Sequence, residues 1–146
     1  MNEPASERLD AFRDDLRRVA VIRDPAERAL EVVGIIEAAG AALGASPVIV
    51  GGMAVYFWTA DESFLTRDID VVMDTSPPVR ALLDALGFER ESDGRHWRLR
   101  DTDVLLEAPD SRLDAGVVVS RVRLDSGRVA RVLSLVDVLL DRLDEF

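Results

Sequence analysis

The chain has 146 residues, of which 48% are hydrophobic and 32% charged, a composition typical of one globular domain rather than of a disordered chain. It has no cysteine, which excludes disulfides, thiol catalysis and cysteine-bound zinc. It also has no apolar run of the length or type that a membrane span or a signal peptide needs, so we expect a cytoplasmic protein with no membrane partner. The formal net charge of −10 disfavours tight, non-specific binding to nucleic acid.

The first 44 residues predict two helices. Apolar residues at helical spacing define one face of the first helix, with Ser6 as its predicted N-cap: Leu9, Phe12, Leu16 and Val19. Asp24 followed by Pro25 is a second start signal, a capping acid before a proline at the first helical position. From there to Gly44 the residues are largely apolar, which predicts a helix buried against a sheet.

From residue 47 the pattern changes to short apolar runs, which are typical of strands. We expect strands over residues 48–50, 67–73, 88–91, 95–100, 104–108, 117–124 and 129–133, and helices over 54–59, 75–87 and 134–146. Asp93-Gly94 and Asp125-Ser126-Gly127 predict hairpin turns, and Ser134 is the predicted cap of the last helix. The chain therefore predicts one α+β domain, a mixed β-sheet flanked by helices. Its parts would be two N-terminal helices (1–44), a sheet core (45–133) and a closing helix (134–146).

The most informative stretch covers residues 48–73. A buried strand that leads into Gly51-Gly52 and a helix presents backbone N–H groups where a phosphate can bind without a side chain in the way. Asp68 and Asp70 are two residues apart on a strand, so their carboxylates leave the same face while the alternate residues face the core. Such a pair is costly unless a cation lies between them, and hard oxygen ligands suit Mg²⁺ or Mn²⁺. A phosphate-binding turn beside a divalent-metal site predicts phosphoryl or nucleotidyl transfer.

This stretch resembles the signature of the DNA polymerase beta superfamily of nucleotidyltransferases. It is most similar to the small bacterial minimal-nucleotidyltransferase and abortive-infection groups, which are often found in toxin–antitoxin pairs. The resemblance implies that Gly51 and Gly52 bind the triphosphate of an NTP and that Asp68 and Asp70 bind two Mg²⁺ ions. It also implies that a nucleoside monophosphate moves to a hydroxyl group of a protein, small-molecule or tRNA acceptor, with release of pyrophosphate.

The resemblance also implies a third acid on a neighbouring strand, for which Asp103 and Glu107 are the candidates. They are four residues apart and share one face of a predicted strand. Glu107 is preferred because it follows the apolar run and, with Pro109, resembles a Leu-Glu-x-Pro step of some members; Asp103 is the alternative. Glu107 would bind the catalytic ion and help to deprotonate the acceptor hydroxyl. Thr66 has the same parity as the aspartates, so its hydroxyl could contact phosphate or metal-bound water.

A second interpretation is a catalytically degenerate, antitoxin-like module that keeps the fold and binds a partner protein. It is favoured by Phe64, which stands where many relatives have an arginine, and by the absence of lysine, since all 18 basic residues are arginine. His96, beside Trp97 in a predicted hairpin strand, is expected to be a surface or packing residue rather than a base. The neighbouring arginines are expected to form a solvated face: Arg95, Arg98 and Arg100.

Overall fold

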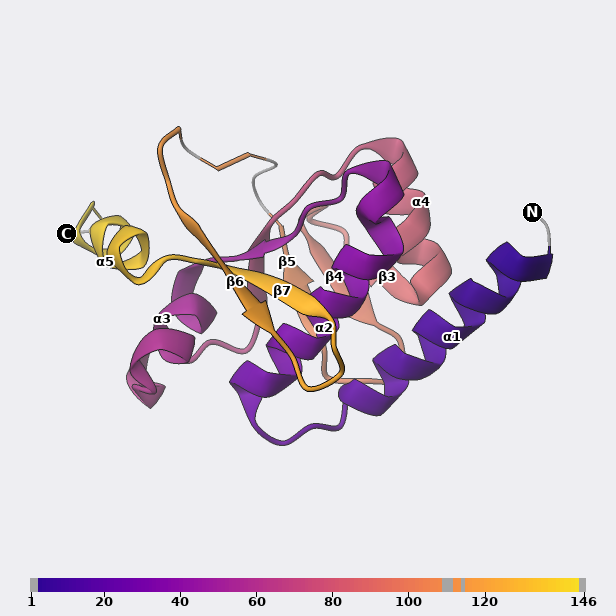
Figure 1. Ribbon diagram of the computed structural model, residues 1–146, viewed down its shortest axis with the longest axis horizontal. Coiled ribbons are helices and arrows are strands. Elements are labelled where there is room, and N and C mark those ends of the chain that lie inside the picture. Colours follow the sequence, from indigo (N-terminus) through magenta and orange to yellow (C-terminus); the bar gives the residue numbers. More distant parts are fainter. Residues whose placement is uncertain (1–2, 109–111, 114, 145–146) are drawn as a thin grey trace.

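A seven-stranded mixed β-sheet lies at the centre of the computed structural model, which describes residues 3–108, 112–113 and 115–144 (Figure 1). The strands are β1 (Val48–Ile49), β2 (Ile69–Val72), β3 (Phe88–Arg90), β4 (His96–Leu99), β5 (Leu105–Glu107), β6 (Val119–Arg123) and β7 (Val129–Leu133). They are arranged in the order β3-β4-β5-β2-β1-β7-β6. The β2–β5 and β1–β7 pairs are parallel and the other pairs are antiparallel. The predicted α+β class with a mixed sheet is confirmed.

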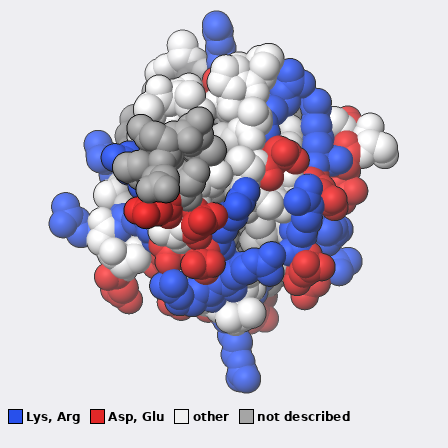
Figure 2. Space-filling view, turned by 90° about the vertical axis from the view of Figure 1, so that its right-hand side faces the viewer, with Lys and Arg blue, Asp and Glu red and all other residues white. Residues whose placement is uncertain are grey.

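Five α-helices flank the sheet in the described part of the chain: α1 (Glu3–Val19), α2 (Pro25–Gly40), α3 (Gly51–Thr59), α4 (Pro77–Leu86) and α5 (Leu135–Asp144). Two short 3₁₀ turns, η1 (Ala41–Leu43) and η2 (Glu62–Phe64), follow α2 and α3. In Figure 1, α1 and α4 lie at one end of the molecule and α3 and α5 at the other. Figure 2 views the molecule from the side of α1 and α4, where arginine and acidic side chains are mixed. None of the helices described here has the length and hydrophobicity that crossing a membrane requires.

Capping residues set the starts of several helices. The Asp24 carboxylate accepts a 3.0 Å hydrogen bond from the backbone N–H of Glu27, and Pro25 is the first residue of α2, as predicted. The predicted cap of α5 is also present, because the Ser134 hydroxyl accepts a bond from the N–H of Asp137. The predicted cap at Ser6 is wrong: α1 already begins at Glu3, and a proline at position 4 is compatible with the first turn of a helix.

Both predicted hairpins are present. β3 pairs with β4 across the Asp93-Gly94 turn, and β6 pairs with β7 across the turn at residues 125–127. Gly94 and Gly127 have φ values of +78° and +88°, in the left-handed region that glycine adopts without strain. The two hairpins form the two ends of the sheet, so the central strands β5, β2 and β1 lie between them.

One face of the central strands packs into the core, and the other is only half-buried. In β2 the residues alternate between buried and intermediate, with Ile69 4% and Val71 0% exposed. In β5, Leu106 is fully buried while Leu105 and Glu107 on either side are not. The predicted alternation is therefore confirmed, and the half-buried face is the one that carries the acidic residues.

Candidate functional site

Three polar side chains lie in a line across adjacent strands on this half-buried face. Asp70 of β2 is the register partner of Glu107 in β5, and Glu107 is in turn the partner of His96 in β4. Register partners on neighbouring strands project their side chains to the same face of the sheet. Asp68 immediately precedes β2, two residues before Asp70. The strand order, rather than nearness in sequence, brings these residues together.

Asp68, His96 and Glu107 form a compact cluster. The Nε2 atom of His96 lies 3.1 Å from Asp68 Oδ2 and 3.4 Å from Glu107 Oε2. One ligand atom from each of the three lies within 4.8 Å of the other two, so together they could hold a metal ion. Two ligand atoms that bind the same ion at about 2.1 Å are about 3.0–3.4 Å apart. The two distances from His96 Nε2 agree with that separation. The His96 side chain is only 17% exposed and the two carboxylates about a quarter, so the cluster is shielded but open to solvent.

The Asp93 carboxylate orients the imidazole of His96 from the hairpin turn. Asp93 Oδ2 is hydrogen-bonded to His96 Nδ1. Its Oδ1 accepts hydrogen bonds from the backbone N–H groups of Arg95 and His96, at 2.9 and 3.1 Å. The pKa of Asp93 is lowered to about 2, mainly by the hydrogen bond from the backbone N–H of Arg95. Burial raises this pKa, but the hydrogen bonds from His96 lower it further. Metal-binding histidines commonly donate their second ring N–H to a carboxylate in this way, which leaves the other nitrogen directed at the ion.

Acidic neighbours control the charge of His96. Burial alone lowers the pKa of the imidazole, but the hydrogen bonds to Asp93 and Asp68 and the charges of Asp93 and Glu107 outweigh it. The net result is a pKa above the ordinary value. The guanidinium of Arg95 adds a second cation at the rim, with its Nε 3.9 Å from Glu107 Oε1. The cluster therefore has an environment that favours positive charge between the carboxylates.

The glycine turn lies directly against Asp70. Gly51 has φ +64°, and a Cβ built on it would be 3.1 Å from both Cβ and Cγ of Asp70 and nearer still to its Oδ2. The backbone N–H of Val50 donates to the Asp70 carbonyl oxygen at 2.9 Å, which holds the turn beside β2. Helix α3 begins at Gly51 rather than at Ala54, so both glycines belong to its first turn. Their backbone N–H groups thus lie at a helix N-terminus next to an acidic residue.

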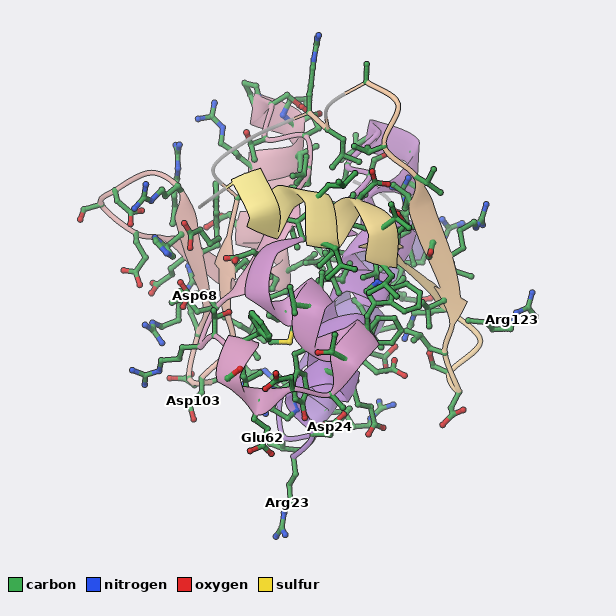
Figure 3. All side chains as sticks on the ribbon, turned by 90° about the vertical axis from the view of Figure 1, so that its left-hand side faces the viewer. Arg23, Asp24, Glu62, Asp68, Asp103 and Arg123 are labelled. Carbon is green, nitrogen blue, oxygen red and sulfur yellow. The ribbon has the colours of Figure 1, made fainter. Side chains whose placement is uncertain are left out.

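The two candidates for a third acid are placed differently. Glu107 is part of the cluster, whereas Asp103 is exposed and lies in a bend that precedes β5. Figure 3 shows Asp68 and Asp103 at separate places along this side of the molecule. Pro109, which completes the Leu-Glu-x-Pro step, lies outside the described residues. Thr66 is exposed, and its hydroxyl donates to the backbone carbonyl oxygen of Asp68 at 2.9 Å.

His96 is the residue that the sequence reasoning missed. It was expected to be a surface or packing residue, yet it connects Asp68 and Glu107. A local signal was present: Trp97 is buried at 3% exposure, so His96, the preceding residue in β4, must face the opposite side of the sheet. That side is the acidic one.

Comparison of the chain with protein-family models, curated proteins and solved structures finds no match. Fold and site together describe an α+β protein with a candidate metal centre of two carboxylates and one imidazole. The geometry of this centre and of the adjoining glycine turn therefore carries the functional argument.

Proposed function

We propose that the chain is a metal-dependent nucleotidyltransferase that moves a nucleoside monophosphate from an NTP to a hydroxyl acceptor. The observation that supports this most is the contact between the Gly51 turn and Asp70, on the face where Asp68, His96 and Glu107 converge. Nucleotidyl transfer needs phosphate-binding N–H groups beside a divalent cation, because negative charge on the reacting phosphate must be neutralised. Both features also serve other phosphoryl transfers, and the motif resemblance is what favours nucleotidyl transfer among them.

The residues of the site divide the roles in this proposal. The N–H groups of Gly51 and Gly52 bind the triphosphate, and Asp68, His96 and Glu107, with Asp70 beside them, hold Mn²⁺ or Mg²⁺. A cation held by these residues would supply charge stabilisation at the attacking and leaving oxygens. Glu107 accepts the proton of the acceptor hydroxyl. The Thr66 hydroxyl, bonded to the Asp68 carbonyl oxygen, fixes the backbone that carries the first aspartate.

The presence of His96 favours Mn²⁺ over Mg²⁺ as the cation. Mg²⁺ prefers oxygen ligands alone, whereas imidazole nitrogen suits transition metals. The acidic net charge of −10 favours a protein or small-molecule acceptor over tRNA. A place in a toxin–antitoxin pair belongs to the same proposal on the motif resemblance alone, and a cytoplasmic location stays an expectation from the sequence.

A binding experiment tests this function without knowledge of the acceptor. The melting temperature is measured with Mn²⁺ or Mg²⁺ and each of the four NTPs. A ligand at 100 times its Kd stabilises the protein by about 2.7 kcal/mol, which for this size raises the melting temperature by roughly 5–10 °C. We expect Glu107→Gln to remove the metal-dependent shift and the matched variant Asp103→Asn to retain it. No shift with any NTP, or loss of the shift in Asp103→Asn but not in Glu107→Gln, contradicts the proposed site.

Activity is then measured by transfer of label from α-³²P-NTPs to acceptor pools of protein, tRNA and small molecules. Asp68→Asn combined with Asp70→Asn is expected to abolish the transfer. Unchanged labelling in this double variant would show that the activity does not come from the proposed centre.

The second candidate function is an antitoxin-like, catalytically inactive module that binds a protein partner. It is favoured by apolar side chains that are exposed on α5 and beside it: Val118, Leu135, Val136, Leu139 and Leu140. Exposed apolar patches often mark protein interfaces. This candidate predicts no thermal response to NTP and metal.

A further inference from the structure

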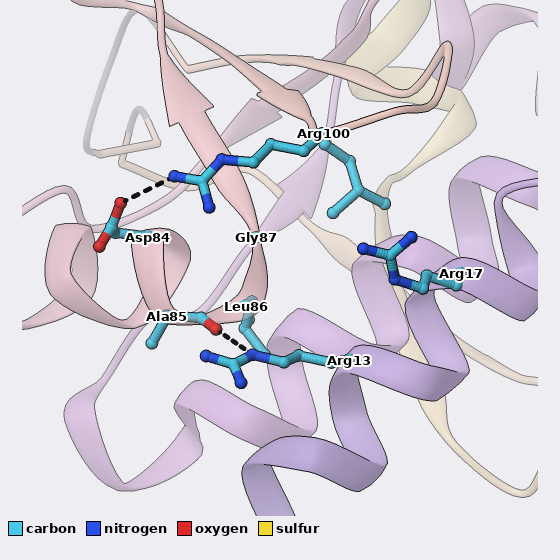
Figure 4. A pocket seen from close by; sticks show the side chains of 8 residues that line it. Arg13, Arg17, Asp84, Ala85, Leu86, Gly87 and Arg100 are labelled. Carbon is cyan, nitrogen blue, oxygen red and sulfur yellow. Dashed lines mark hydrogen bonds and ion pairs between the residues drawn. The ribbon is translucent and has the colours of Figure 1, made fainter.

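A cavity of about 240 Å³ lies between α1, the C-terminal end of α4 and the end of β4 (Figure 4). Three arginines line it: Arg13 and Arg17 from α1, and Arg100, which follows β4. Asp84 is the one acidic side chain among its lining residues. The lining therefore carries three positive charges and one negative charge, in a chain whose formal net charge is −10.

The three guanidinium groups differ in how they are held. Arg13 Nε donates to the carbonyl oxygen of Ala85, which fixes this side chain against the end of α4. The guanidinium of Arg100 forms ion pairs with Asp84 (Nη2 to Oδ1, 3.7 Å) and with Glu89 (Nε to Oε1, 3.0 Å). Arg17 makes no hydrogen bond or ion pair with any residue that the structure describes. A cation in the lining of a cavity is thus available to a ligand.

The acidic groups near the cavity compete only weakly with an anionic ligand. Asp84 and Glu89 are 76% and 61% exposed, compared with 49% for Arg100, so these pairs lie at the surface. Asp10, the partner of Arg13, is 69% exposed. Exposed ion pairs contribute about 0–1 kcal/mol each, because water solvates both partners well. A ligand anion inside the cavity can replace them.

The end of α4 does not repel an anion as an open helix C-terminus would. Its last carbonyl groups carry partial negative charge when they lack partners. Here the carbonyl oxygen of Ala85 is bonded to Arg13, and the N–H of Gly87 donates to the carbonyl oxygens of Asp84 and Leu83. These three carbonyl oxygens of α4 therefore have donors, and the Asp84 carboxylate is the negative charge that this helix contributes to the lining.

We propose that this cavity binds the phosphate group of a small phosphate monoester. Guanidinium groups bind phosphate through paired N–H donors, and a dianion matches the net charge of the lining better than a single carboxylate does. The cavity volume of about 240 Å³ is below the roughly 300–1,000 Å³ of pockets for drug-sized ligands. The cavity therefore fits a compact molecule. The site is separate from the acidic centre, because Arg100 follows the end of β4 and His96 begins that strand.

The proposal is tested by NMR titration of the isotope-labelled protein with methyl phosphate at pH 8, in a buffer with a metal chelator that removes any contribution of the acidic centre. We expect saturable shifts of the backbone N–H resonances of Gly87 and Arg100, which line the cavity, and a weaker response to acetate. Equal affinity for acetate and methyl phosphate would overturn the assignment to phosphate. So would titration without any shift at Gly87.

Charge variants separate a defined site from general attraction. Arg17→Gln removes a side chain without a partner among the described residues, so the fold is retained, and it is expected to raise the Kd for methyl phosphate about tenfold. Asp84→Asn is expected to lower the Kd. The matched control is Arg123→Gln on β6, at the opposite edge of the sheet, where Figure 3 shows the side chain pointing away from the molecule. An equal loss of affinity in Arg17→Gln and Arg123→Gln would overturn the proposal.

Discussion

Replacing Gly51 with alanine tests the contact between the glycine turn and Asp70 on which the proposed function depends. Gly51 has φ +64°, and the added Cβ would lie 3.1 Å from the Cβ and Cγ atoms of Asp70, with Oδ2 nearer still. The approach to Oδ2 is closer than real Cβ atoms show and the other two are tighter than most, so either the turn or Asp70 has to move. The substitution therefore perturbs the backbone and the acidic side chain together.

The structure contains a control that separates the two effects. Gly44 has φ +71°, almost the same backbone conformation, but nothing lies within 4 Å of a Cβ built on it. Gly44→Ala should therefore cost only the left-handed strain, about 1–2 kcal/mol. Gly51→Ala adds an overpacking cost of about 1–3 kcal/mol. We expect the free energy of unfolding to fall by about 2–5 kcal/mol in Gly51→Ala, more than in Gly44→Ala.

Urea unfolding followed by tryptophan fluorescence measures both variants, provided that the slope with denaturant is unchanged. Asp70→Gly removes the side chain that the new Cβ would meet. In that background we expect the cost of Gly51→Ala to fall to the level of Gly44→Ala, because neighbouring residues are coupled. Equal costs of Gly51→Ala and Gly44→Ala in the wild-type background would refute the close approach of Asp70 to the turn.

Three further predictions concern His96, Asp24 and Trp58. The pKa of His96 is raised in the folded state, so its contribution to stability is complete below the ordinary pKa of about 6.5 and is lost as the pH rises through the folded value. The stability difference between wild type and His96→Gln should therefore shrink with rising pH, and the NMR resonance of this single histidine should titrate above pH 6.5; titration below it would contradict the predicted sign. Asp24→Ala removes the cap of α2 and should cost about 1 kcal/mol in urea unfolding. Trp58→Phe removes the 2.8 Å bond from Nε1 to the carbonyl oxygen of Leu133 and should cost about 1–2 kcal/mol, which the same assay detects.

Turns and most helix caps could be predicted because their signals are local. The Asp24-Pro25 start of α2 needs only residues within one helical turn, and the side-chain bond to Glu27 follows from that spacing. The Asp93-Gly94 turn likewise needs only its two flanking strands. The prediction of Ser6 as the cap of α1 was wrong because a second start signal lies nearby, a proline at position 4, and the helix begins before it at Glu3.

The order of the strands could not be predicted, because it depends on contacts between distant parts of the chain. Four of the six neighbouring pairs join strands that are consecutive in the sequence, but the β5–β2 and β1–β7 pairs, which complete the sheet, join distant ones. Alternation predicted correctly which face Asp70 and Glu107 would take, since the period of two depends only on the strand itself. It did not predict their pairing, which is a matter of register between β2 and β5.

His96 shows how a site residue can be missed even when its face is predictable. Its partners come from the entry to β2, from β5 and from the turn that precedes its own strand, and no short sequence window contains them all. A lone histidine on a hairpin is ordinarily a solvated or packing residue, but here Asp68 and Glu107 lie at Nε2 and Asp93, from the hairpin turn, lies at Nδ1. A buried imidazole can be held between carboxylates when it is protonated or when it shares a cation with them. The same imidazole that stabilises the acids as a cation must lose its proton to bind a metal, so metal affinity at this centre should increase as the pH rises through the folded pKa of His96.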